Sequence, residues 1–155
     1  MNKKHKGIAP KNKILVNDRI ADNLLQQIIL KPESYDVILA PNVDGDYISD
    51  EAGALVGNVG VLGSMNVGDS TAIFEPVHGT APKYTGMNIA DPIGAIRAGT
   101  MMLDYLELSR ASKVIETAIT NALKLKKATG DLAAHLGAKP LGTSEFADAV
   151  IASME

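Results

Sequence analysis

Apolar side chains recur at helical spacing near the start of the chain. At about 100° per residue, the apolar positions of residues 18–30, DRIADNLLQQIIL, fill one half of a helical wheel. They are Ile20, Ala21, Leu24, Leu25, Ile28 and Ile29. Asp22 falls roughly 20° beyond Ile29, at the edge of the apolar face. A helix is therefore expected over 18–30, ending at Lys31-Pro32 because proline disfavours a helical conformation in the residue before it.

The next apolar run, YDVILAPN at 35–42, has the short, β-branched pattern of a buried strand. A helix followed directly by a buried strand favours a layered α/β fold with a parallel component. A loop, NVDGDYIS, is expected next. Ser49 then predicts a helix start as its N-cap, with Asp50 and Glu51 in the first turn.

The second half of the chain predicts mainly helices. Residues 66–89 have a loop-like composition with one strand-like run, AIFEPV. Asp91-Pro92 predicts a helix start, an N-cap followed by proline, with the helix reaching about residue 106. Residues 110–127 carry a single apolar stripe that Gly130 is expected to end. A last helix is expected to open at Thr143 or Ser144.

Composition narrows the class of protein. A chain of 155 residues with a formal charge of -3 can bury one ordinary core and gives no electrostatic reason to expect nucleic acid or an anionic membrane as partner. No apolar run approaches the roughly 20 residues of a membrane span. Cysteine is absent, which fits a reducing cytoplasm and leaves carboxylates or imidazoles as metal ligands. Carboxylates favour Mg²⁺ or Mn²⁺. The basic residues 1–17 predict a flexible arm.

Asp46 and Asp50 are the first candidates for chemistry. They stand four residues apart around the expected loop-to-helix junction, so their carboxylates can converge on one point. Two carboxylates that close repel each other unless a cation or a proton lies between them. From spacing alone, the more frequent alternative is that they stabilise the dipole of the helix.

The segment HGTAPKYTG, residues 78–86, is the second candidate. Gly79, Thr80 and Ala81 are small enough for their backbone amides to approach a phosphate or a base, and the flanking side chains that add donors, charge and a stacking surface are His78, Lys83 and Tyr84. The segment is not a GxGxxG fingerprint, so nothing supports a Rossmann dinucleotide site. Taken alone, a glycine-bearing turn is the more frequent alternative.

The order of these pieces along the chain resembles that in the β-decarboxylating dehydrogenases, which include isocitrate and 3-isopropylmalate dehydrogenases. The resemblance runs from about residue 13 to the C-terminus through RIADNLLQQ, GDYISDEAGALVG, NVGD, FEPVHGTAPKY and SEFADAVI. Within the family, the motifs GDYISD and HGTAPKY are similar to the corresponding motifs of the isocitrate dehydrogenases. The fold implied is the family's three-layer αβα fold, incomplete here. Residues 18–56 would be part of the small, dimer-forming domain and residues 57–155 the C-terminal part of the large cofactor-binding domain.

The resemblance implies roles for single residues. Asp46 and Asp50 match metal ligands of one subunit, and Asp22 matches the aspartate that reaches the same Mg²⁺ or Mn²⁺ from the neighbouring subunit of a dimer. The residues that match the adenosine-binding loop and the positions near it are His78, Gly79, Thr80, Ala81, Asp91 and Asp131. Asp91 stands where the family usually has an asparagine.

The cofactor is expected to be NADP, with NAD as the alternative. Lys83 and Tyr84 match the positions that favour the 2′-phosphate of NADP, since a lysine there supplies positive charge. Gly130 and Ala134 stand where NADP-dependent bacterial enzymes have a tyrosine and an arginine, so the full phosphate clamp is not expected.

The motifs that carry the family's substrate arginines, catalytic tyrosine and proton-relay lysine have no counterpart in this sequence. We therefore expect the 155-residue chain alone not to turn over isocitrate. Three interpretations stay open. The first is a C-terminal piece of an isocitrate dehydrogenase that acts on isocitrate when complete, and the second is a related activity on isopropylmalate, homoisocitrate or tartrate. The third is not an enzyme: either a self-standing nucleotide- or metal-binding module or an inactive partner that assembles with a full-length subunit.

Overall fold

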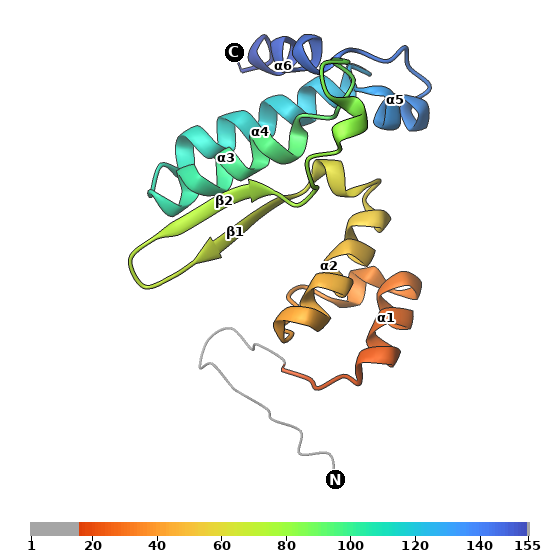
Figure 1. The fold of residues 1–155 in the computed structure, drawn as a ribbon, viewed down its shortest axis with the longest axis vertical. Helices are drawn as coiled ribbons and strands as arrows, with labels where there is room; N and C mark the ends of the chain where they lie inside the picture. The colour runs from red at the N-terminus through yellow and green to blue at the C-terminus, as the bar shows by residue number, and fades with distance from the viewer. Residues whose placement is uncertain (1–15, 155) are drawn as a thin grey trace. The chain divides into compact units, whose positions relative to one another are not determined.

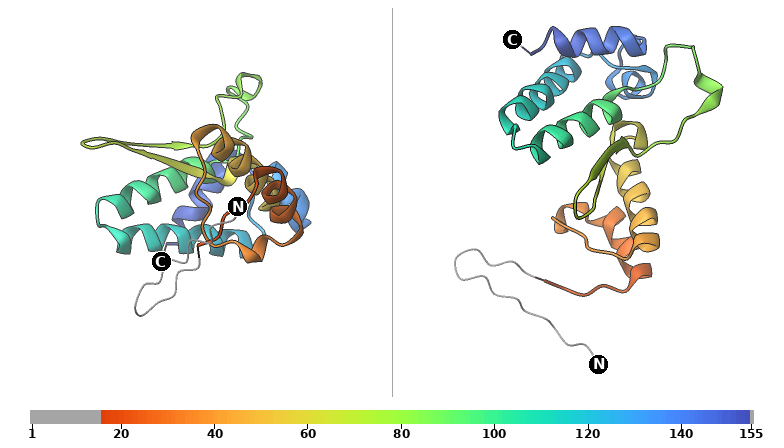
Figure 2. Two further views of the ribbon diagram at one scale, coloured as in Figure 1. Left: turned by 90° about the horizontal axis from the view of Figure 1, so that it is seen from below. Right: turned by 60° about the vertical axis from the view of Figure 1, so that its left-hand side comes forward.

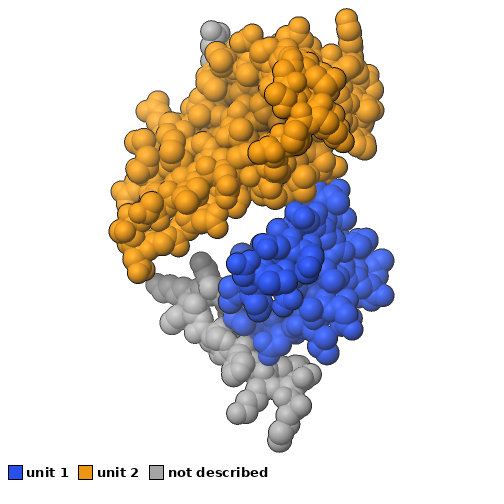
Figure 3. Space-filling view, in the orientation of Figure 1, with its two compact units in different colours: residues 1–55 blue, residues 56–155 orange. Residues whose placement is uncertain are grey.

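The computed structural model describes residues 16–154. The chain forms two compact units, unit 1 over Met1–Leu55 and unit 2 over Val56–Glu155 (Figure 3). Most of the basic arm expected at 1–17 lies outside the described residues, and Val16 and Asn17 are exposed. In the part of the chain that is described, no helix combines the length and the apolar character that crossing a membrane requires.

Unit 1 is a pair of helices (Figure 1). α1 spans Ala21–Leu30, a 3-10 turn follows at Pro32–Ser34, and α2 spans Asn42–Leu55. Their shared core consists of Leu24, Ile28 and Ile48. The helix expected at 18–30 is confirmed, although its apolar face is only half covered, because Ile20 and Ile29 are exposed.

The predicted strand at 35–42 is wrong. The segment between the 3-10 turn and α2 forms neither strand nor helix, and Val37 and Leu39 are 89% and 98% exposed. A strand needs a neighbour for its backbone donors and acceptors, and the described part of unit 1 contains no strand to pair with it.

The predicted loop NVDGDYIS and the helix start at Ser49 are also wrong. The loop residues form the first half of α2, and the Gly45 amide donates to the Pro41 carbonyl at 2.7 Å. The Ser49 hydroxyl donates back to the Asp46 carbonyl at 2.9 Å instead of capping a helix. Gly45 costs a helix about 1 kcal/mol relative to alanine, and packing of Ile48 against α1 offsets that cost.

The exposed apolar segment predicts self-association of the purified protein. Because Val37 and Leu39 are almost fully exposed, we expect light scattering to report a mass above that of the monomer. Val37→Lys with Leu39→Lys should lower that mass. Asn23→Lys with Gln26→Lys, which adds the same charge at exposed polar positions, is the control and should lower it less. A monomeric unsubstituted protein would contradict the prediction.

Unit 2 opens with a 3-10 turn at Val59–Val61 and a β-hairpin of β1, Gly63–Val67, and β2, Ala72–Pro76. The strands pair antiparallel from Gly63↔Pro76 to Val67↔Ala72, and this is the only sheet among residues 16–154. The strand AIFEPV is confirmed, β1 was missed, and the expected parallel component is not found in the described residues. The hairpin packs on α3, where the Phe74 and Tyr105 ring centroids are 5.6 Å apart (Figures 1 and 2).

Four helices complete unit 2. They are α3, Ile93–Tyr105, α4, Ser109–Lys124, α5, Gly130–Leu136, and α6, Thr143–Ile151. Their bounds confirm the helices expected after Asp91-Pro92, from about Arg110 and at Thr143. Their common core includes Ile93, Ile119 and Phe146.

Gly130 does not end α4. The helix ends at Lys124, and Lys126 takes the left-handed φ of 58° that terminates it. Gly130 is instead the first residue of α5, a short helix that the sequence pattern did not indicate.

Candidate functional site

The candidate metal carboxylates of unit 1 lie on two helices. Asp46 and Asp50 are one turn apart on α2, so they share a face, and side chains at this spacing have Cβ atoms about 5–6 Å apart. Both are exposed, as is Asp22 in the first turn of α1. Within residues 16–154 no three His, Asp or Glu side chains come close enough to hold a metal ion together.

Helix geometry therefore pairs Asp46 with Asp50, while Asp22 does not join them within one chain. The donor chemistry of the pair fits a hard divalent ion, because both side chains offer accessible carboxylate oxygens. The correction to the loop also changes their setting. They share a face through the pitch of a helix and not through a loop-to-helix junction.

Glu51, next to Asp50, is a residue whose environment the sequence did not reveal. Its Oε2 atom is buried and has no hydrogen-bond partner in the described part of the chain. A buried carboxylate oxygen without a donor is costly, so this atom is a point of local instability beside the Asp46–Asp50 pair.

The candidate cofactor segment lies in unit 2 between β2 and α3. Every residue from Gly79 to Ala90 is exposed, and a Cβ at Gly79 would meet no atom within 4 Å. Figure 2 shows this segment, in green, standing out from the helices of unit 2. The side of the backbone at Gly79 is therefore free of other atoms.

Two details shape that segment. Ala81 has a φ of 41°, in the left-handed region, and it precedes the 3-10 turn Pro82–Tyr84. The Lys83 ammonium lies 4.7 Å from the centroid of the Tyr84 ring, a cation–π contact that keeps its charge beside an aromatic face. His78 is half-buried, with Nδ1 2.9 Å from the Gly79 carbonyl oxygen.

The remaining candidates, Asp91 and Asp131, belong to a polar cluster that the structure assembles from distant parts of unit 2. The Asn58 amide donates to Asp131 Oδ2 at 2.6 Å, and the Thr129 hydroxyl donates to Asp131 Oδ1 at 3.0 Å. Asn58 also accepts from the Gly60 amide at 2.6 Å. Sequence reasoning missed both Asn58, which lies 73 residues from Asp131 along the chain, and Thr129, which lies two residues from it.

Asp91 is turned towards the start of α3. Its Oδ1 accepts from the Ile93 amide at 2.8 Å, as an N-cap side chain does, and its Oδ2 is buried without a hydrogen-bond partner in the described part of the chain. Burial raises the pKa of the Asp91 carboxyl, and the negative charge of Asp131 acts in the same direction. The Ile93 amide, the Thr129 hydroxyl and the positive charge of Arg97 oppose that rise in pKa.

Asp91→Asn is expected to stabilise the protein at neutral pH. The raised pKa means that the folded state holds the proton more tightly than the unfolded state, whose pKa is about 3.9. Stability is therefore lost as the pH rises from about 3.9 through the higher folded-state pKa. Asparagine keeps the acceptor for Ile93 without that loss.

Denaturant unfolding at a series of pH values measures the effect. The stabilisation of the Asp91→Asn variant should vanish below about pH 3.9, where both states bind the proton. Asp69→Asn, at an exposed position of the hairpin turn, is the control. A difference from the unsubstituted protein that is independent of pH would contradict the assignment.

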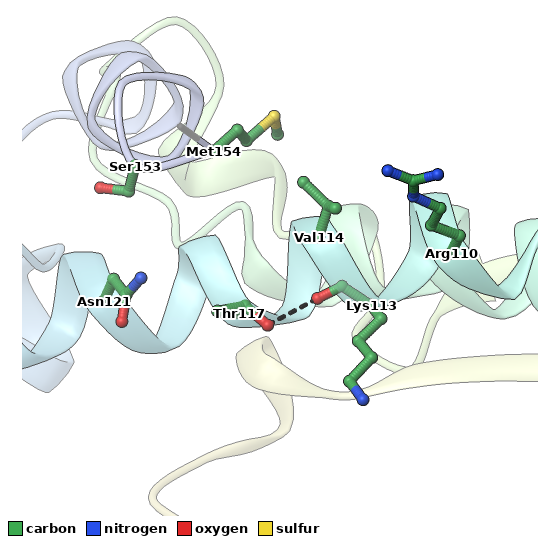
Figure 4. A pocket seen from close by; sticks show the side chains of 7 residues that line it. All are labelled: Arg110, Lys113, Val114, Thr117, Asn121, Ser153 and Met154. Carbon is green, nitrogen blue, oxygen red and sulfur yellow. Dashed lines mark hydrogen bonds between the residues drawn. The ribbon is translucent and has the colours of Figure 1, made fainter.

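A shallow pocket of about 290 Å³ lies elsewhere in unit 2, between α4 and the chain after α6 (Figure 4). Its lining is Arg110, Lys113, Val114, Thr117, Asn121, Ser153 and Met154. The Thr117 hydroxyl donates to the Lys113 carbonyl of its own helix at 2.7 Å. None of the candidate site residues lines this pocket.

Comparison with known proteins settles the family. The model of the isocitrate/isopropylmalate dehydrogenase family matches residues 2–150. The chain belongs to this family. The matched residues 2–150 include Asp46, Asp50 and the whole cofactor segment, so the candidate sites lie within the part of the chain that matches the family.

Curated relatives and solved structures agree with the match. The isocitrate dehydrogenase [NADP] of Caldococcus noboribetus is 46% identical over 97% of this chain and 36% of that protein. The isocitrate dehydrogenase [NADP] of Archaeoglobus fulgidus is 43% identical over 98% of this chain and 37% of that protein. The crystal structure of isocitrate dehydrogenase from Methylococcus capsulatus aligns with a TM-score of 0.83 and 36% identity, over 88% of this chain and 40% of that one.

A β-decarboxylating dehydrogenase of Thermococcus kodakarensis aligns with a TM-score of 0.80 and 36% identity, over 91% of this chain and 40% of that one. The chain thus spans a little over a third of the length of the curated relatives named above. These alignments confirm the expected α/β fold of the family over the part that the chain spans.

Proposed function

We propose that this chain provides the metal- and cofactor-binding part of an isocitrate dehydrogenase, which oxidises and decarboxylates isocitrate to 2-oxoglutarate. The observation that carries the proposal is 43–46% identity, over nearly the whole chain, to the two NADP-dependent isocitrate dehydrogenases named above. In this proposal residues 18–56 contribute to the small, dimer-forming domain and residues 57–155 to the large cofactor-binding domain.

The metal-binding role falls to the aspartates of unit 1. Asp46 and Asp50, one turn apart on α2, would hold Mg²⁺ or Mn²⁺ between them. Asp22 would complete the site of the partner subunit, in keeping with its exposure on α1 and its separation from the pair. A divalent ion bound there supplies a Lewis acid for the substrate's hydroxyl and adjacent carboxylate. The exposed aspartates orient it and neutralise its charge.

The nucleotide-binding role falls to the exposed segment of unit 2. The backbone amides of Gly79, Thr80 and Ala81 would face the adenosine half of the cofactor, with His78 as a further donor. Asp91 follows the exposed segment directly, and the charge of Asp131 acts on it, so both would contribute near the end of the segment. Lys83 would pair with the 2′-phosphate. Its contact with the Tyr84 ring limits the positions that its ammonium explores before binding.

NADP is the proposed cofactor. The positive charge of Lys83 supports it, as do the names of the relatives cited above. Gly130 and Ala134, on α5, offer no side chain that could bind a phosphate, so Lys83 carries most of the preference for NADP over NAD.

A chimera tests the proposal. In the Archaeoglobus fulgidus isocitrate dehydrogenase, the segment that aligns with this chain is replaced by the chain's own residues. The chimera should reduce NADP when isocitrate and Mn²⁺ are present, while the 155-residue chain alone should not. A folded chimera that oxidises isopropylmalate but not isocitrate, or that binds neither metal nor nucleotide, would overturn the proposal.

A further inference from the structure

The exposed segment 78–90 has little internal support. Backbone hydrogen bonds inside it are local, from Tyr84 to Ala81, Thr85 to Pro82 and Met87 to Tyr84. Just before the segment, the Val77 amide donates to the Leu62 carbonyl at 3.0 Å, which fixes its first end to the hairpin region. The contacts at its second end therefore decide how many conformations the segment can adopt.

That second end is bound to the start of α6. The backbone carbonyl of Asn88 accepts from the Thr143 amide at 3.0 Å, and Asn88 Oδ1 accepts from the Ser144 amide at 3.0 Å and from the Ser144 hydroxyl at 3.1 Å. The Thr143 hydroxyl donates to the Ala90 carbonyl at 2.6 Å. We call this set the Asn88 junction, made by Asn88, Ala90, Gly142, Thr143 and Ser144.

The Asn88 junction provides hydrogen-bond acceptors for the first amides of α6. The first amides of a helix have no partner within it, and a side chain at the N-cap position usually accepts from them. Gly142 occupies that position and has no side chain. Asn88, which lies 56 residues before Ser144 along the chain, accepts from the amides of Thr143 and Ser144 in its place.

Two further features show how closely the parts fit. Asn88 has a φ of 55°, a left-handed conformation that asparagine adopts more readily than most residues. A Cβ added to Gly142 would lie 2.6 Å from Asn88 Nδ2 and 3.0 Å from the Asn88 carbonyl oxygen, so the approach requires glycine. The amino end of α6 is itself held firmly, because Phe146 in its first turn is fully buried in the core of unit 2.

We infer that Asn88 is a positioning residue for the nucleotide: it transmits the rigidity of α6 to the segment that carries Gly79 to Tyr84. The inference rests on the proposed nucleotide-binding role of that segment. When the junction is broken, the segment populates conformations that do not bind, and the apparent affinity falls in proportion to the binding-competent fraction. The substrate class concerned is an adenine dinucleotide bearing a 2′-phosphate.

The test uses the full 155-residue protein, with NADP affinity from calorimetry and amide hydrogen exchange of residues 78–90. Asn88→Gly retains the left-handed backbone but removes the side-chain acceptor, so NADP binding should weaken about fivefold or more, the effect of a lost N-cap. Exchange in 78–90 should become faster. Asn88→Asp keeps an acceptor for Ser144 and should restore affinity and protection.

Two more variants distinguish the loss of the Asn88 junction from the added backbone flexibility of a glycine at position 88. Gly142→Ala breaks the contact from the α6 side without altering the segment and should weaken NADP binding as Asn88→Gly does. Glu107→Gly is the matched control, since Glu107 is exposed, has a φ of 62°, and makes no side-chain hydrogen bond among the described residues. It should leave NADP affinity and exchange in 78–90 unchanged.

The outcomes are distinct. Unchanged exchange in both Asn88→Gly and Gly142→Ala overturns the junction as a support of the segment. Faster exchange with unchanged NADP affinity overturns the positioning role alone. If the unsubstituted protein binds neither NADP nor NAD, the proposed nucleotide role fails and the positioning role with it, while the exchange data still decide whether the junction holds the segment.

Discussion

Asp50→Asn in the Archaeoglobus chimera is expected to lower kcat/KM for isocitrate at least about 100-fold, since losing even an outer partner of a metal ligand costs about 10- to 100-fold. Asparagine keeps the size of the side chain but removes one of the two negative charges that α2 presents on a single face. Affinity for Mn²⁺ should fall in parallel, because hard divalent ions depend on carboxylate charge.

Steady-state rates at rising Mn²⁺ concentration measure the effect, and Asp46→Asn should behave in the same way. Asp44→Asn is the matched control. Asp44 is also exposed on α2 but stands two residues before Asp46, and side chains two apart on a helix do not share a face. Equal losses in Asp44→Asn and Asp50→Asn would show that the general charge of the helix matters and would contradict a metal site at Asp46 and Asp50.

Phe146→Ala is expected to lower the free energy of unfolding of unit 2 by about 3–5 kcal/mol, the usual cost of removing a fully buried phenylalanine. The Phe146 side chain is 0% exposed and packs in one cluster with Ile93, Ile119 and Val150, which come from three helices. Its removal therefore leaves a cavity where α3, α4 and α6 meet.

Denaturant unfolding followed by circular dichroism measures the loss. Phe74→Ala is the control, because Phe74 lies on β2, is only half-buried and packs against Tyr105 at the end of α3. It should cost clearly less than Phe146→Ala. Equal losses would contradict a core of unit 2 that is centred on Phe146.

The sequence predicted those elements whose own periodicity is strong. The helices α1, α3, α4 and α6 were all found, since an apolar stripe at a period of 3.6 residues reflects local geometry. β1, GSMNV, was missed because it has neither a β-branched run nor clear alternation, and it forms through pairing with β2 and packing on α3.

The wrong predictions in unit 1 share one cause. The run YDVILA has the composition of a strand, but a strand forms only when a neighbour accepts its backbone hydrogen bonds. NVDGDYIS has the composition of a loop, but Ile48 within it packs against Leu24 and Ile28 and the segment becomes helical. In both places the environment decided between conformations that the local sequence left close in energy.

By itself the sequence determined the family and the identity of the candidate residues, because motifs such as GDYISD and HGTAPKY carry their chemistry in residue type and order. Only the tertiary structure decided how those residues are held. It brings Asn58 to Asp131 across 73 residues and Asn88 to Ser144 across 56. Such contacts arise when separate elements bury a common core, and no local pattern along the chain encodes which polar groups then meet.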